Sequence, residues 1–219
     1  MISLSLYCSS DSVSLALFDK EKEILFLQKK TESKNKSDIL IALIKKLFEN
    51  FSSKKLRFIY FSRGPGSFTS IRSLVSIAQG IRLSNKSKIM TTTIFEIFLY
   101  QILKNKKPVL FVYKDSRRDF YFQFFDFIDL KFVKVSRILS GDILKINKKV
   151  QEFLKEKQMT KLFTYSNETH DEIKEISNIK FQELSIDARS VFQAINFGFA
   201  SKRISIIYHH PHYGKRINN

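Results

Sequence analysis

Hydrophobic and polar residues alternate at the start of the chain, which is typical of β-strands. Ser and Leu alternate over residues 2–7, and two further apolar runs follow at 13–18 and 24–28. The polar stretch Asp19-Lys20-Glu21-Lys22 separates the second run from the third and predicts a hairpin turn. The first 28 residues are therefore expected to form three consecutive strands.

The pattern then changes to the period of a helix. Residues 39–50 carry apolar side chains three and four positions apart, which make a wide apolar stripe. Ser37 or Asp38 precedes the stripe and can cap a helix. Packing on the chain's own sheet explains such a stripe, and a partner helix could also cover part of it.

The stretch 62–72 lies between a strand pattern and a second helix pattern. Aromatic and β-branched residues crowd positions 56–61, whereas apolar residues recur at helical spacing over 67–83. Gly64 and Gly66 are two of only six glycines and predict a tight turn, and Ser67 is a plausible N-cap. The sequence therefore predicts a strand, a Gly-Pro-Gly turn and a helix.

A turn that leads into a helix can hold an anion, because free backbone amides and the helix dipole point the same way. A corner that binds nothing explains the same pattern, since short glycine motifs often occur by chance. The candidate anion-binding residues in this turn are Arg63, Gly64, Pro65, Gly66, Ser67 and Thr69.

The predicted helix 67–83 is apolar on more than one side, with only Arg72, Gln79 and Arg82 strongly polar. A helix of this kind is usually buried. Either a second helical layer of the same chain or another chain is expected to cover it.

The second half of the chain repeats the strand-rich opening of the first. After a strand at 89–92 and a helix at 94–103, the polar stretch 104–108 suggests a boundary between units 1–104 and 105–219. The C-terminal tail can pack back on the first unit. The predicted elements of the second unit are strands at 109–113, 120–127, 131–138 and 162–165 and helices at 142–157, 167–176 and about 187–200.

Composition places the chain among globular proteins, because 43% of its 219 residues are hydrophobic and 27% are charged. The single cysteine, Cys8, fits a reducing compartment, and no signal peptide or long apolar span is evident, so we expect a cytoplasmic protein without membrane contact. A net charge of +17 attracts polyanions such as tRNA. The lysines are scattered, however, and an AT-rich genome would give the same bias.

The segment from Arg63 to Thr69, with Arg72 in step, resembles the signature Arg-Gly-Pro-Gly-Ser-Phe-Thr-x-x-Arg of the TsaB family, also called YeaZ or glycoprotease-like. Ala78-Gln79-Gly80 resembles the family's next segment. The stretch 114–121 resembles the opening of its second lobe, and 211–215 resembles its closing motif.

The resemblance implies a two-lobed actin-like, sugar-kinase-like α/β fold, with a β-meander and helices in each lobe. It also implies a scaffold of the machinery that makes N6-threonylcarbamoyladenosine in tRNA, without catalysis of its own. Expected partners are the catalytic paralogue TsaD and the ATPase TsaE, with tRNA reached through the complex and a homodimer possible for the chain alone.

The resemblance further implies where the sites lie. Asp115 and Arg117 should face the cleft between the lobes, opposite the Gly64–Gly66 turn. Two helices of the first lobe should dock the partner, although Leu74 stands where relatives often have a small residue. The expected interface residues are Ile39, Leu43, Phe68, Ile71, Arg72, Leu74, Val75 and Ala78.

Catalytic chemistry has little support in the sequence. Relatives carry a phosphate-site Asp where this chain has Tyr7, which cannot hold a magnesium ion as a carboxylate does. All four histidines follow residue 169, so no metal site is expected in the first lobe. We expect no catalytic residue and no cofactor, except for a structural nucleotide that the cleft could hold.

Two other function classes stay open at this point. An actin-fold phosphotransferase or a peptidase would need catalytic groups that the sequence does not identify. A self-sufficient tRNA-binding protein would follow from the net charge alone.

Overall fold

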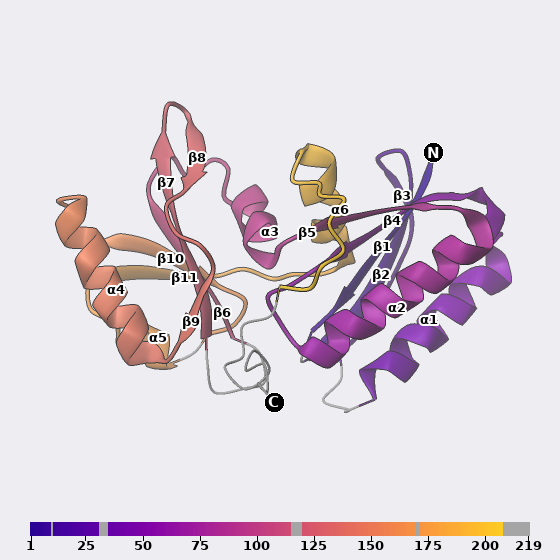
Figure 1. The fold of residues 1–219 in the computed structure, drawn as a ribbon, viewed down its shortest axis with the longest axis horizontal. Coiled ribbons are helices and arrows are strands. Elements are labelled where there is room, and N and C mark those ends of the chain that lie inside the picture. The colour runs from indigo at the N-terminus through magenta and orange to yellow at the C-terminus, as the bar shows by residue number, and fades with distance from the viewer. Residues whose placement is uncertain (10, 31–34, 115–119, 170, 208–219) are drawn as a thin grey trace, which may run out of the picture.

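The computed structural model describes residues 1–9, 11–30, 35–114, 120–169 and 171–207. Within these ranges the chain forms two β-sheets, one in each half of the molecule (Figure 1). Two helices lie between the sheets, and the remaining helices cover their outer faces (Figure 1). The molecule is therefore layered, with a sheet on each side of a central helical layer.

The first sheet is built from the predicted opening strands and two later ones. Its strand order is β3-β2-β1-β4-β5, antiparallel among β1, β2 and β3 and parallel from β1 to β4 and β5. Leu6 lies opposite Leu15 on β2 and Phe61 on β4, so alternate residues of each strand face the same side. The strands are β1 (Ile2–Cys8), β2 (Ser12–Asp19), β3 (Lys22–Lys30), β4 (Leu56–Ser62) and β5 (Lys88–Thr92).

The second sheet repeats the topology of the first. Its order, β8-β7-β6-β10-β11, again has three antiparallel strands followed by two parallel ones. The short β9 (Leu139–Gly141) pairs with β7 outside this path. The strands are β6 (Val109–Lys114), β7 (Phe120–Ile128), β8 (Lys131–Lys134), β10 (Leu162–Ser166) and β11 (Ile179–Glu183).

The helices repeat in the same order as the strands. In each half, one helix follows the meander, one joins the two parallel strands, and one follows the last strand. This duplication is the two-lobed actin-like α/β fold that the sequence predicts. The helices are α1 (Lys36–Asn50), α2 (Phe68–Asn85), α3 (Ile94–Gln101), α4 (Ile143–Glu156), α5 (Asp171–Lys174) and α6 (Ala188–Phe197), with a 3-10 turn at Ser53–Lys55.

Three clusters of buried side chains hold these layers together. One lies between the first sheet and α1 and α2, and another between the second sheet and α4 and α5. The third joins the inner faces of both sheets through α3 and α6. In β1, Leu4 and Leu6 face the outer cluster whereas Tyr7 faces the central one, as the alternation of the sequence predicts.

The last described segment returns to the first sheet. Helix α6 packs on β1, β2, β4 and β5, and its first amide, at Ala188, donates to the buried Ser14 Oγ at 2.9 Å. Thr91 then pairs with Ser201, and the Ile207 amide donates to the Arg63 carbonyl at 2.9 Å. The second half of the chain therefore helps to build the first lobe.

Among the differences from the sequence prediction are two element boundaries and one strand. The strand expected over 131–138 ends at Lys134, and the helix expected over 167–176 is limited to α5. Strand β11 was not predicted, because Lys, Gln and Glu interrupt its apolar residues. Only Ile179 and Phe181 of this edge strand are half-buried, so its sequence pattern is weak.

Candidate functional site

The Gly-Pro-Gly turn lies where β4 ends, and the rest of the chain holds it firmly. Gly64 has a φ of +105°, and a Cβ there would lie 2.9 Å from the Ile207 carbonyl oxygen, so the position requires glycine. The Arg63 amide donates to the Thr92 carbonyl at 2.9 Å, and the Gly64–Pro65 peptide is cis. The turn is therefore fixed by β5 on one side and by the C-terminal segment on the other.

Ser67 caps α2, as predicted, because its Oγ accepts from the Ser70 amide at 3.4 Å. Pro65 and Gly66 are buried, whereas Thr69 is exposed. Burial lowers the pKa of Arg63, and its Nε has no hydrogen-bond partner among the described residues. The anion-binding role of this turn stays a prediction.

A pair of tyrosines joins the two lobes beside this turn. Tyr7 on β1 and Tyr113 on β6 are both buried, and a hydrogen bond links their side chains. A Cβ at Gly66 would lie 3.5 Å from the Tyr113 hydroxyl. Burial is the main cause that raises the pKa of Tyr7 above its ordinary value, so this phenol stays protonated. The two tyrosines lie on β1 and β6, which are the first strands of the two equivalent lobes. Neither tyrosine supplies a carboxylate that could bind a metal ion at these positions.

A small cleft of about 170 Å³ opens next to the tyrosine pair. Among its described lining residues are three carboxylates, Asp11, Glu168 and Glu183, and one ammonium group, Lys30. This excess of negative charge disfavours a phosphate chain. The predicted cleft residues Asp115 and Arg117 lie outside the described residues.

Three of the predicted interface residues lie inside the monomer. Ile71, Leu74 and Ala78 are 3%, 1% and 0% exposed, and the last two belong to the core beneath α1 and α2. A partner cannot contact them without displacing α2, so the interface prediction is corrected for these three. They occupy the side of α2 that faces its own sheet.

The other predicted interface residues are accessible to different degrees. Ile39, Leu43 and Val75 are half-buried against the same core, and Phe68 at the start of α2 is also half-buried. Arg72 is exposed, with its guanidinium carbon 3.7 Å from the centroid of the Phe68 ring. Their role in docking stays a prediction.

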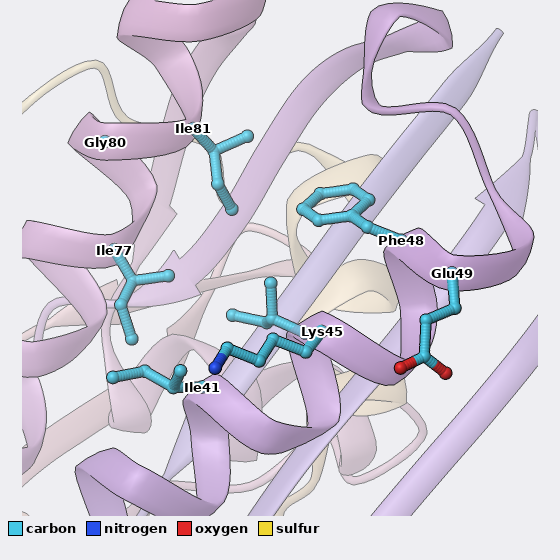
Figure 2. A pocket seen from close by; sticks show the side chains of 8 residues that line it. Ile41, Lys45, Phe48, Glu49, Ile77, Gly80 and Ile81 are labelled. Atoms are coloured by element: carbon cyan, nitrogen blue, oxygen red, sulfur yellow. The ribbon is translucent and has the colours of Figure 1, made fainter.

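An apolar groove with a volume of about 600 Å³ lies between α1 and α2. Figure 2 shows Ile41 and Phe48 on α1 pointing across it toward Ile77 and Ile81 on α2. Ile41 is 42% exposed. The lining residues are Ile41, Ile44, Lys45, Phe48, Glu49, Ile77, Gly80 and Ile81, which we call the α1/α2 groove.

The sequence prediction named none of these groove residues as interface positions. The sequence feature that could have identified them is the width of the apolar stripes on the two predicted helices, which exceeds what one sheet can cover. On α1, Leu40, Ile44 and Leu47 face the sheet, so Ile41 and Phe48 fall on the neighbouring side that faces α2.

Other kinds of site have less support. No three His, Cys, Asp or Glu side chains of the described residues could together hold a metal ion. All four histidines, His170, His209, His210 and His212, lie outside those residues. None of the described helices has the length and apolar character to cross a membrane.

Comparison with known proteins gives one matching family model, described as "TsaD: tRNA N6-adenosine threonylcarbamoyltransferase", over residues 28–182. Two curated relatives are both named tRNA threonylcarbamoyladenosine biosynthesis protein TsaB. The one from Buchnera aphidicola subsp. Acyrthosiphon pisum is 34% identical over 108 residues, which cover 48% of each chain. The one from Buchnera aphidicola subsp. Schizaphis graminum is 30% identical over 113 residues, which cover 50% of this chain and 53% of that protein.

The chain thus spans about half the length of the curated relatives it matches. A solved structure, YeaZ from Pseudomonas aeruginosa, superposes over 95% of this chain and 99% of its own with a TM-score of 0.68. Sequence identity between these two is 13%, so this likeness shows the shared fold.

Proposed function

Because the chain belongs to the family of TsaD, tRNA N6-adenosine threonylcarbamoyltransferase, and is of the TsaB/YeaZ type, we propose that it is a non-catalytic subunit of tRNA threonylcarbamoyladenosine biosynthesis. In this proposal it pairs with a TsaD-type subunit, which carries out the transfer. A TsaE-type ATPase binds the pair, and tRNA is reached through the complex in the cytoplasm.

The observation that carries this proposal is the α1/α2 groove. Apolar side chains line it from both helices, and the monomer leaves it open. Removing such a surface from water is favourable by about 25 cal/mol per Å² of apolar area, and this gain opposes the entropic cost of association with a second subunit. The groove therefore supports a docking role for the first lobe, on residues other than Ile71, Leu74 and Ala78.

The interlobe cleft supports the absence of catalysis and of a cofactor of its own. Tyr7 on β1 and Tyr113 on β6 place two buried, hydrogen-bonded phenol side chains beside the cleft. The carboxylates Asp11, Glu168 and Glu183 surround the remaining space. The tyrosines supply no carboxylate for a metal ion, and the excess of negative charge from the three acidic residues disfavours the phosphates of a nucleotide.

The test is pairing with the TsaD-type protein of the same organism. The solution mass of the mixture, measured by light scattering after size exclusion, should equal the sum of the two chains. Ile77→Glu places a carboxylate in the apolar groove and should abolish the pair. Circular dichroism checks that this variant remains folded.

Leu144→Glu is the matched control, because Leu144 is 74% exposed on α4, which covers the other sheet. This variant should pair as well as the wild type. Equal pairing by Ile77→Glu would refute the groove as the docking site. Transfer of threonylcarbamoyl by the isolated chain would refute the non-catalytic role.

A further inference from the structure

Charge is distributed unevenly along the chain. Residues 50–95 contain eight basic side chains and no acidic one, whereas the rest of the chain contains 30 basic and 21 acidic ones. A genome that favours lysine would raise the number of basic residues everywhere, but it would not remove the acidic residues from one stretch. The distribution therefore needs a physical reason within this stretch.

Six of the eight basic residues lie together at one end of the first sheet. The Asn85 side chain donates to the Ser53 carbonyl at 2.9 Å, which ties the end of α2 to the 3-10 turn. The Ser87 hydroxyl donates to the Leu56 carbonyl at 3.2 Å, so the segment after α2 also meets the start of β4. The six residues, which we call the basic end, are Lys54, Lys55, Arg57, Arg82, Lys86 and Lys88.

The charges of the basic end have no acidic partner among the described residues. All six residues are exposed, and none of the described ion pairs includes any of them. Asp19, two strands away from Leu56 in the sheet, already pairs with the Met1 amino group. Glu49, the last acidic residue before the stretch, lines the α1/α2 groove. Positive charge is therefore gathered at this end without compensation.

The dipole of α2 explains only part of this arrangement. A helix C-terminus favours cations, and Arg82 and Lys86 lie in the last turn and at the C-cap of α2. Lys86 has a φ of +60° there, a conformation that glycine or asparagine adopts at lower cost. The other four basic residues lie on a 3-10 turn of three residues and at the starts of β4 and β5, where the dipoles are small.

A nucleic acid backbone is the partner that this surface fits. Exposed lysines and arginines bind phosphates, and these contacts dominate the affinity of proteins for nucleic acids. A protein interface or a membrane surface would also need a cluster of exposed apolar side chains. In the described stretch 50–95, Leu83 is the only large apolar residue that is exposed.

We propose that the basic end binds the phosphate backbone of a structured RNA by direct contacts. The inference rests on the proposed function only for the identity of this RNA as tRNA, and it adds a contact made by this chain itself. Strand β4 runs from the basic end to the Gly-Pro-Gly turn, so the RNA contact and that turn lie at opposite ends of the sheet. Figure 1 shows the end of α2 at the side of the first lobe that faces away from the second sheet.

The experiment measures how the chain alone binds fluorescently labelled, unmodified tRNA, by anisotropy at about 50–300 mM potassium chloride. Each phosphate contact releases about one counterion, so the logarithm of the affinity falls linearly with the logarithm of the salt concentration. The triple variant Lys54→Gln, Lys55→Gln, Lys88→Gln removes three contacts. It should bind at least about tenfold more weakly at about 100 mM salt, and the slope should become shallower by about two to three.

The matched control removes the same charge from the second lobe, in the triple variant Lys148→Gln, Lys155→Gln, Lys161→Gln. Two of these lysines lie on α4 and the third precedes β10, and all three are exposed and absent from the described ion pairs. This variant should change the affinity by no more than about threefold. Circular dichroism checks that both variants remain folded.

The outcomes distinguish this inference from the proposed function. Equal weakening by the two triple variants, or no tRNA binding by the wild type at about 50 mM salt, would overturn the basic end as an RNA site. Tighter binding to polyglutamate or to phosphatidylglycerol vesicles than to tRNA would overturn RNA as its partner. Pairing with the TsaD-type protein tests the proposed function separately, so a chain that binds tRNA through the basic end but does not pair would refute that function alone.

Discussion

Replacing Gly64 by alanine tests whether the Gly-Pro-Gly turn depends on its clamp from the C-terminal segment. An L-residue at a φ of +105° costs about 1–2 kcal/mol. The new methyl group would also stand 2.9 Å from the Ile207 carbonyl oxygen, so this segment must move. Movement weakens the hydrogen bond from the Ile207 amide to Arg63, which is worth about 0.5–1.5 kcal/mol. We expect a loss of about 2–3 kcal/mol.

Two other glycines provide matched controls. Gly198 also has a positive φ, +125°, but no described atom lies within 4 Å of its Cβ position. Gly198→Ala should therefore show only the backbone cost, about 1–2 kcal/mol. Gly80→Ala has neither cost and should stabilise the chain by about 0.5–1 kcal/mol.

The assay is urea unfolding of the four proteins, followed by circular dichroism and fitted with a common slope. The order of stability should be Gly80→Ala, wild type, Gly198→Ala and Gly64→Ala. If Gly64→Ala costs no more than Gly198→Ala, the contact with Ile207 does not hold the turn. If Gly64→Ala costs nothing, the turn itself is not fixed as the structure shows.

Three further predictions concern the core and the contacts between lobes. Ser14→Ala should cost about 1–3 kcal/mol in urea unfolding, because it leaves the buried Ala188 amide without its acceptor. Leu74→Ala should cost about 3 kcal/mol in the same assay, because Leu74 is 1% exposed in the core, whereas a surface residue would cost little. Burial alone would raise the pKa of Glu96, but the hydrogen bond and charge of Lys134, 2.8 Å away, together with the hydrogen bonds of Thr93, outweigh it and lower the pKa below its ordinary value of 4.5. The stability from this pair is present above about pH 4.5 and is lost as the pH falls through the lower folded value, so Lys134→Met should flatten acid unfolding in that range, and an unchanged pH profile would contradict the link.

The elements with a strong periodic pattern were predictable from the sequence. Alternation of Ser and Leu places Leu4 and Leu6 on one face of β1, and that face is the buried outer one. The turn follows from the positive φ of Gly64, and the cap follows from the preference of Ser for the N-cap position. Local chemistry is enough to predict where both features lie, although tertiary contacts with Thr92 and Ile207 also hold the turn.

The interface positions were less predictable, because a wide apolar stripe does not show which of its edges meets the sheet. Leu74 and Ile77 lie three residues apart on α2, yet the first is buried in the core and the second lines the groove. Their assignment depends on how α1 and α2 lie together, which is a tertiary contact. The Tyr7–Tyr113 pair likewise joins residues of different lobes.

The duplicated fold has one marked asymmetry, in the helix that joins the two parallel strands of each sheet. In the first lobe this helix, α2, has 18 residues, whereas its described counterpart α5 has four. Among the described residues, a groove that needs a long second helix therefore forms on the first lobe and not on the second. In the proposed docking role, each chain would therefore offer one such surface, so that assembly through it would close at a pair and not extend into a polymer.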